Sequence, residues 1–242
     1  MGQVSNVFLI SGNAGQGKTT IAKNLAFALR NFGFDVLLVD GDLRTPKLGY
    51  HTGIPLANKT IQDVLLGHRS LKDAIYTKAS GLKLLLSCLT EIKTPHPSTL
   101  LPELRKLADV IVIDTPTYDH PWYETKCDTI LVSQPDFPSV MEVQKLSKHA
   151  NVNGIVINRA HRDDIDLSIG NIQQLVSKPV LGVVPAELRV REALRHGYSL
   201  IEFHPELEAS IVLKQIAAKL MNLEYKAPLR ELSLLARLGL FP

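Results

Sequence analysis

Short runs of apolar residues alternate along the chain with stretches that repeat at the helical period. Seven of these runs are apolar at consecutive positions, as expected of strands buried on both faces of a sheet. They are Val7–Ile10, Asp35–Asp40, Leu82–Ser87, Val110–Pro116, Thr129–Pro135, Gly154–Arg159 and Val180–Pro185. Their alternation with helical segments predicts an α/β fold, in which helices flank a mostly parallel sheet.

The two clearest helices lie near the ends of the chain. Thr19–Asn31 has apolar residues on one face and Gly33 at the position of a C-terminal cap, and Glu206–Asn222 has the same periodicity. No internal repeat or linker divides the sequence. We therefore expect one domain over residues 1–225, followed by a short tail over residues 226–242.

Composition agrees with a single large α/β domain. The chain has 242 residues, of which 45% are hydrophobic and 21% are charged, and its formal net charge is +3. This charge gives no specific signal for a nucleic-acid partner. Cys88 and Cys127 have neither metal-binding nor redox spacing and are expected to be buried thiols. Because no apolar run reaches the ~18 residues of a membrane span, and no signal peptide is apparent, we expect a cytoplasmic protein.

The segment SGNAGQGKTT (residues 11–20) lies between the first strand and the first helix and matches G-x-x-x-x-G-K-T. Such a loop wraps backbone N–H groups around phosphates. We expect Lys18 to bind the β- and γ-phosphates and the Thr19 hydroxyl to bind Mg²⁺, so ATP or ADP with Mg²⁺ is the predicted cofactor. The predicted nucleotide-binding residues of this loop are Gly12, Asn13, Ala14, Gly15, Gln16, Gly17, Lys18, Thr19 and Thr20.

Three aspartates follow predicted strands, and strand ends are where open α/β sheets bind ligands. Asp114 closes VIVIDTP and is expected to hold Mg²⁺ through a water molecule. Asp40 and Asp42 are two residues apart in VDGDLRTP. We expect Asp40 near the metal and Asp42 on a switch loop, where it orients or deprotonates the attacking group. The alternative is an ordinary turn with two solvated carboxylates.

Together these motifs resemble the MinD/ParA group of deviant Walker ATPases, and archaeal MinD-like proteins most of all, over nearly the whole chain. The segments GIVINRAHRDD and VLGVVPAELRVREALRHGYSLIEFHP resemble the C-terminal half of that group. The resemblance implies the three-layer sandwich of a P-loop NTPase. It also implies that Asn158 recognises the adenine edge with Arg159 nearby, and that Val184, Pro185 and Ala186 form a wall around the base.

One position departs from the family pattern K-G-G-x-G-K-[ST]. The first lysine of that pattern reaches the phosphates of the partner subunit in an ATP-bound dimer, and Asn13 stands in its place here. Asparagine is neutral and shorter, so it cannot make the same contact. The resemblance thus implies a slow ATPase, as a homodimer or other oligomer, whose nucleotide state controls the assembly or localisation of an unidentified partner.

Two alternatives to this function stay open. One is a scaffold that binds nucleotide without hydrolysing it. The other is a protein kinase similar to the bacterial tyrosine kinases of the BY-kinase group, which also lack the lysine and in which Asp42 would act as the base. Their tyrosine-rich C-terminal tail is absent, because only Tyr225 follows Tyr198.

Two further segments are candidates for contact with partners. Residues 229–242 read LRELSLLARLGLFP and predict a basic amphipathic helix. This helix could bind the inner face of the cell membrane peripherally or dock on protein. In the predicted second switch, residues 117–126, Trp122 and Tyr123 could contact a partner or pack beneath the loop. Asp119 and His120 are candidates to approach the γ-phosphate.

Overall fold

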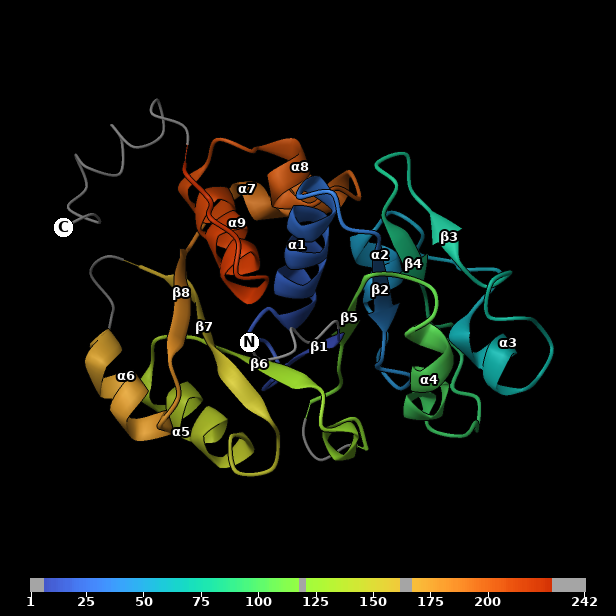
Figure 1. The fold of residues 1–242 in the computed structure, drawn as a ribbon, viewed down its shortest axis with the longest axis horizontal. Coiled ribbons are helices and arrows are strands. Elements are labelled where there is room, and N and C mark those ends of the chain that lie inside the picture. The colour runs from blue at the N-terminus through green and yellow to red at the C-terminus, as the bar shows by residue number, and fades with distance from the viewer. Residues whose placement is uncertain (1–6, 118–120, 162–166, 228–242) are drawn as a thin grey trace.

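The computed structural model describes residues 7–117, 121–161 and 167–227. Within these residues the strands form one eight-stranded sheet in the order β3-β4-β2-β5-β1-β6-β7-β8 (Figure 1). The strands are β1 Val7–Gly12, β2 Val36–Asp40, β3 Tyr76–Thr77, β4 Lys83–Leu85, β5 Val110–Asp114, β6 Asp128–Ser133, β7 Val152–Ala160 and β8 Val180–Pro185. All neighbouring strands are parallel except β3 and β4. The predicted α/β class is confirmed.

Helices cover both faces of the sheet and complete the three layers (Figure 1). The helices are α1 Lys18–Asn31, α2 Leu48–His51, α3 Ile61–Leu65, α4 Leu101–Leu104, α5 Phe137–Leu146, α6 Ile169–Val176, α7 Arg189–Arg195, α8 Leu200–Phe203 and α9 Glu208–Leu220. Two short 3₁₀ turns are η1 Pro97–Leu100 and η2 Tyr123–Thr125. Alternate residues of β1 pack on opposite faces of the sheet. Phe8 and Ile10 pack with α1 and α9, while Val7 and Leu9 pack on the side of α4.

The sheet order brings the three predicted motifs together. Strand β1, which leads into the phosphate loop, lies between β5 and β6, with Ile10 opposite Asp114. Strand β2 lies on the other side of β5, with Asp40 opposite Asp114. Because these strands are parallel, their carboxyl ends and the loops that follow them meet at one edge of the sheet.

The elements differ from the sequence predictions mainly at their ends. Strand β1 continues through Ser11 to Gly12, and helix α1 begins at Lys18. Gly33 has φ +95° after α1, as expected of a cap. The two-residue strand β3 was not predicted, because a pairing this short leaves no periodic pattern. Cys127 is buried as expected, but Cys88 is partly exposed, so that part of the prediction was wrong.

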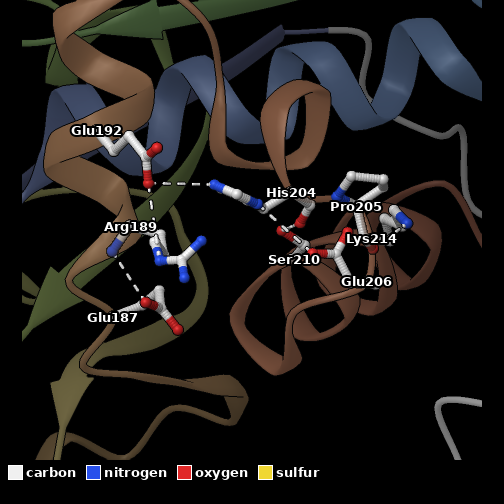
Figure 2. A network of polar contacts seen from close by, with 8 residues as sticks. All are labelled: Glu187, Arg189, Glu192, His204, Pro205, Glu206, Ser210 and Lys214. Atoms are coloured by element: carbon white, nitrogen blue, oxygen red, sulfur yellow. Dashed lines mark hydrogen bonds and ion pairs between the residues drawn. The ribbon is translucent and has the colours of Figure 1, made fainter.

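Polar contacts link helices α7, α8 and α9 (Figure 2). His204 follows α8, and its ring nitrogens lie 3.4 Å from Glu192 of α7 and 3.5 Å from Glu206. The His204 carbonyl oxygen accepts a hydrogen bond of 2.7 Å from the Ser210 hydroxyl of α9. These contacts link α7 and α9 through His204, which follows α8.

The chain follows the domain surface beyond α9 as far as Ala227. Ala227 is buried against Ile211, and the Tyr225 ring centroid is 5.8 Å from that of Phe32. The predicted amphipathic helix, residues 229–242, lies outside the described residues. Within the described part of the chain, no helix is both long and apolar enough to cross a membrane.

Candidate functional site

The phosphate loop connects the buried end of β1 to the first residue of α1, and it packs closely at both ends. Gly12 has φ +140°, and a Cβ atom there would lie 2.4 Å from the Val132 carbonyl oxygen of β6. Gly17 has φ +92°, and a Cβ atom there would lie 2.3 Å from the Asn158 amide nitrogen. Both positions require glycine, for conformation and for space.

The side chain of Gln16 anchors the phosphate loop through hydrogen bonds. Its side chain is 6% exposed; Nε2 donates to the Ser139 hydroxyl (3.0 Å), and Oε1 accepts from the Gln134 backbone N–H (2.6 Å). Gln134 and Ser139 follow β6 and were not among the predicted site residues. Gln16 itself was predicted to bind nucleotide, and this stays a prediction; its side chain fixes the phosphate loop to the segment that follows β6.

Lys18 lies at the start of α1 and connects the phosphate loop to the second switch. Its ammonium donates to the Asn13 carbonyl oxygen and to the Thr117 hydroxyl, both at 2.9 Å. Burial lowers the pKa of Lys18, Asp114 and Asp42 oppose the shift, and the charge of Lys47 adds to it. Thr117 was not predicted as a site residue, because its contact with Lys18 spans about a hundred residues of sequence.

Thr19 and Asp114 form the predicted metal-binding pair. The Thr19 hydroxyl donates to Asp114 Oδ2 at 2.6 Å. Asp114 is 3% exposed, and its Oδ1 atom is buried without a hydrogen-bond partner among the described residues. Burial raises the pKa of Asp114 to about 6, against the opposing hydrogen bond from Thr19 and the charge of Lys18. A buried carboxylate oxygen beside a hydroxyl is the hard oxygen donor set that Mg²⁺ prefers, so these residues fit the metal.

Asp40 and Asp42 point to different surroundings, as their spacing predicted. Asp40 is fully buried, and its two oxygens accept backbone N–H groups of Leu48 (3.2 Å) and Asp42 (3.4 Å). Burial, with the nearby charge of Asp114, raises the pKa of Asp40 well above its usual range. Asp40 therefore organises the switch loop, and its role near the metal stays a prediction.

Asp42 lines a pocket beside the phosphate loop, but its carboxylate is engaged by its own loop. Oδ1 accepts the backbone N–H groups of Arg44 (3.1 Å) and Thr45 (3.0 Å), and Oδ2 accepts the Thr45 hydroxyl (2.8 Å). These three hydrogen bonds orient the carboxylate and leave Oδ2 able to accept one further donor, such as a water molecule. Its predicted catalytic role stays a prediction.

Strand β7 reaches the phosphate loop from the other side. The register between β7 and β8 shifts between Asn158 and Ala160, and Arg159, at φ +57°, is the residue of the bulge. Its guanidinium donates to the Gly15 carbonyl oxygen (3.1 Å), and the Asn158 amide nitrogen donates to the Gln16 carbonyl oxygen (2.8 Å). In this structure Asn158 supports the loop, and adenine recognition stays a prediction.

The predicted base wall lies at the end of β8. Val184 is buried, whereas Pro185 and Ala186 are partly exposed. The Ala186 N–H donates to the Ala160 carbonyl oxygen at 3.0 Å, which places this segment beside the bulge of β7. Its role toward the base stays a prediction.

A pocket of about 160 Å³ opens between these elements. The predicted residues that line it are Gly15, Gly17, Lys18, Thr19, Thr20, Asp42, Asp114 and Arg159. Gly12, Asn13, Ala14, Gln16, Asp40, Asn158, Val184, Pro185 and Ala186 are not in its lining. Lys47 and His51, which were not predicted, are. Within the described residues no group of three or more His, Cys, Asp or Glu side chains forms a separate metal site.

The aromatic residues of the second switch pack inside the protein. Trp122 is fully buried, and its indole N–H donates to the Gly41 carbonyl oxygen at 3.3 Å. The Tyr123 hydroxyl contacts the Ser11 hydroxyl at 2.5 Å. Packing beneath the loop is therefore correct, and contact of these two residues with a partner is wrong for this conformation. Asp119 and His120 lie outside the described residues.

Residues 7–200 match the CobQ/CobB/MinD/ParA nucleotide binding domain. The chain belongs to this family. An uncharacterized ATP-binding protein of Methanocaldococcus jannaschii is 30% identical to it over 239 residues, which cover 93% of this chain and 90% of the relative. The family and the sheet order confirm the predicted P-loop fold.

Two solved structures of this family are similar to the chain over most of its length. The cell division ATPase MinD of Pyrococcus furiosus has a TM-score of 0.78 at 26% identity, covering 90% of this chain and 99% of that one. The septum site-determining protein MinD of Pyrococcus horikoshii, solved with Mg-ADP, has a TM-score of 0.75 at 28% identity, covering 88% and 94%. Nucleotide with Mg²⁺ is thus a cofactor of the family, and the donors at Lys18, Thr19 and Asp114 fit it.

Proposed function

We propose that this MinD/ParA-family protein binds ATP with Mg²⁺, hydrolyses it slowly and uses its nucleotide state to control the assembly or localisation of a partner. The observation that carries the proposal is the Thr19–Asp114 hydrogen bond beside Lys18, with a buried oxygen of Asp114 left for the metal. In this proposal Lys18 binds phosphate, Thr19 and Asp114 hold Mg²⁺, and Asp42 positions the attacking water. Bound Mg²⁺ would neutralise charge that develops on the phosphates.

Two features of the site support slow hydrolysis. Asn13 brings no charge to the position that the resemblance assigns to a lysine. The Asp42 carboxylate accepts three hydrogen bonds within its own loop, which leaves it about one acceptor site for a water molecule. The active form that we propose is a homodimer or other oligomer.

Phosphate release from Mg-ATP tests the proposal. We expect slow release by the wild type, none by Lys18→Ala, and at least about a hundredfold loss by Asp42→Ala, the lower end of the contribution of one acid–base group. The Asp42→Ala variant should still bind nucleotide. Light scattering of this variant with ATP should show a mass above that of the monomer. Absence of release from the wild type would refute hydrolysis, and a strictly monomeric mass would refute nucleotide-driven assembly.

The engagement of Asp42 by its own loop also favours a second candidate, a scaffold that binds nucleotide without hydrolysing it. In that case wild type and both variants release no phosphate, yet the wild type still binds Mg-ATP. Assays of Mg-ATP binding and of phosphate release, both made on the wild type over the same dilution series of protein, separate the two candidates.

A kinase is a third candidate, favoured by a cavity of about 970 Å³ beside the nucleotide pocket. Both cavities are lined by Asp42 and Thr117, so an acceptor hydroxyl in the larger one would approach the phosphates. Transfer of labelled phosphate to tyrosine residues would support this candidate. Labelled inorganic phosphate alone would exclude it.

The localisation that we propose is cytoplasmic, with peripheral contact at the inner face of the membrane through residues 229–242. The amphipathic pattern of that segment, beyond the proposed 1–225 domain, supports this. Flotation with vesicles that contain anionic lipid, with and without these residues, measures the contact. Equal flotation of both forms would refute it.

A further inference from the structure

Lys47 lines the nucleotide pocket, although the P-loop motif gives no reason to expect it there. It is the residue that precedes α2, directly after the switch loop that contains Asp42. Its side chain is exposed, and the side-chain ammonium has no hydrogen bond or ion pair within the described part of the chain. An uncommitted ammonium group thus faces a pocket whose neighbouring lysine, Lys18, is already hydrogen-bonded.

Electrostatic effects on three neighbours agree with this position. The charge of Lys47 contributes to the lowered pKa of Lys18 in α1 and to that of His51 in α2, and it opposes the raised pKa of Asp114 in β5. These groups come from three elements that meet at the pocket. Lys47 and Lys18 repel each other there, and an anion placed between them would relieve that repulsion.

We propose that Lys47 binds the terminal phosphate of ATP from within the same chain and so supplies the positive charge that Asn13 does not. The inference rests on the proposed function, because it requires ATP in the pocket. Lys18 is directed at the phosphate loop and the second switch, whereas Lys47 approaches from the end of the switch loop that contains Asp42. A phosphate bound by both would connect the two sides of the pocket.

This contact gives the protein a way to distinguish ATP from ADP. ADP lacks the terminal phosphate, so it has nothing for Lys47 to bind. Lys47 precedes Leu48, whose N–H is held by Asp40, and the other end of α2 is held by Lys23 through the His51 carbonyl oxygen. A phosphate contact at Lys47 would therefore change the balance of conformations of α2 and the switch loop only when ATP is bound.

The test is the ratio of affinities for Mg-AMP-PNP and Mg-ADP, measured by calorimetry. We expect Lys47→Met to weaken AMP-PNP binding about tenfold, as for loss of one charge-assisted hydrogen bond at a partly solvated site, and to change ADP binding less than twofold. Lys47→Arg should keep most of the affinity for AMP-PNP. Arg44→Met is the matched control, since Arg44 is an exposed cation of the same loop that lines only the larger cavity. It should leave both affinities unchanged.

The outcomes separate this inference from the proposed function. If the wild type binds neither nucleotide, the proposed function fails. If it binds both and Lys47→Met keeps the wild-type ratio of the two affinities, the proposed function stands and the role of Lys47 is refuted. The loss in Lys47→Met should also be the same over a hundredfold range of protein concentration. A loss that grows with concentration would place the contact between two chains and overturn the inference.

Discussion

Lys23 should make the stability of the protein rise with pH above neutrality. Its side chain lies in α1 and is 5% exposed. The Nζ atom donates to the carbonyl oxygens of His51 (2.8 Å) and Tyr198 (2.6 Å), so it joins the end of α2 to the loop between α7 and α8. Burial, helped by the charge of Lys78 and opposed by Glu202, lowers the pKa of Lys23 from 10.5 to about 7. A neutral amine still has two N–H groups for these two acceptors.

The size of the effect follows from proton linkage. Between pH 7 and 10.5 the unfolded chain protonates Lys23 and the folded chain does not, so stability increases with pH. The free-energy cost of burying the charged Lys23 ammonium is fully present below pH 7 and disappears near pH 10.5. At ~1.4 kcal/mol per pH unit, the free energy of unfolding should gain about 2.5 kcal/mol from pH 7.5 to 9.5 through this residue alone.

Urea unfolding of the nucleotide-free protein at these two pH values measures the gain. Other groups titrate in the same range, so the informative quantity is the gain of the wild type minus the gain of Lys23→Met. Loss of the two hydrogen bonds lowers the stability of the variant at both pH values and largely cancels in this difference. Lys219→Met, at an exposed lysine of α9, should show the wild-type gain. Equal gains for wild type and Lys23→Met would refute a neutral Lys23.

Three other substitutions test the packing around the site. Gly12→Ala places a Cβ atom 2.4 Å from the Val132 carbonyl oxygen and should destabilise the protein by about 2–4 kcal/mol in urea; an unchanged midpoint would contradict the close packing. Asn158→Ala leaves the buried Gln16 carbonyl oxygen without its donor, at a cost of about 1–3 kcal/mol, and should speed hydrogen exchange in the phosphate loop. Trp122→Phe leaves the Gly41 carbonyl oxygen without its donor and reduces the packing of a fully buried side chain, so it should cost about 1–3 kcal/mol by thermal unfolding; no loss would contradict this packing.

Local sequence patterns predicted the parts of the site that depend on local structure. Buried parallel strands are apolar over consecutive residues, and the phosphate loop has a fixed spacing between such a strand and a helix. The meeting of Thr19 with Asp114 follows from these two facts, since β1 and β5 are neighbours and both end at the same edge.

The rest depends on contacts between residues far apart in sequence. Gln16 contacts Ser139 and the backbone of Gln134, and no spacing rule relates these positions. The direction of the Asp42 carboxylate depends on the N–H groups that its own turn presents, which the alternation of a strand cannot predict. Lys47 belongs to an irregular loop, so its place in the pocket depends on how that loop folds back.

The burial of the Gln16 side chain has a consequence for the kinetics of binding. A phosphate loop held by its own glutamine has its shape before any ligand arrives, so nucleotide should bind without a slow rearrangement of this loop. The dissociation rate, rather than the association rate, would then distinguish one nucleotide from another. The lifetime of the complex would thus depend on the contacts that each nucleotide makes with the residues that line the pocket.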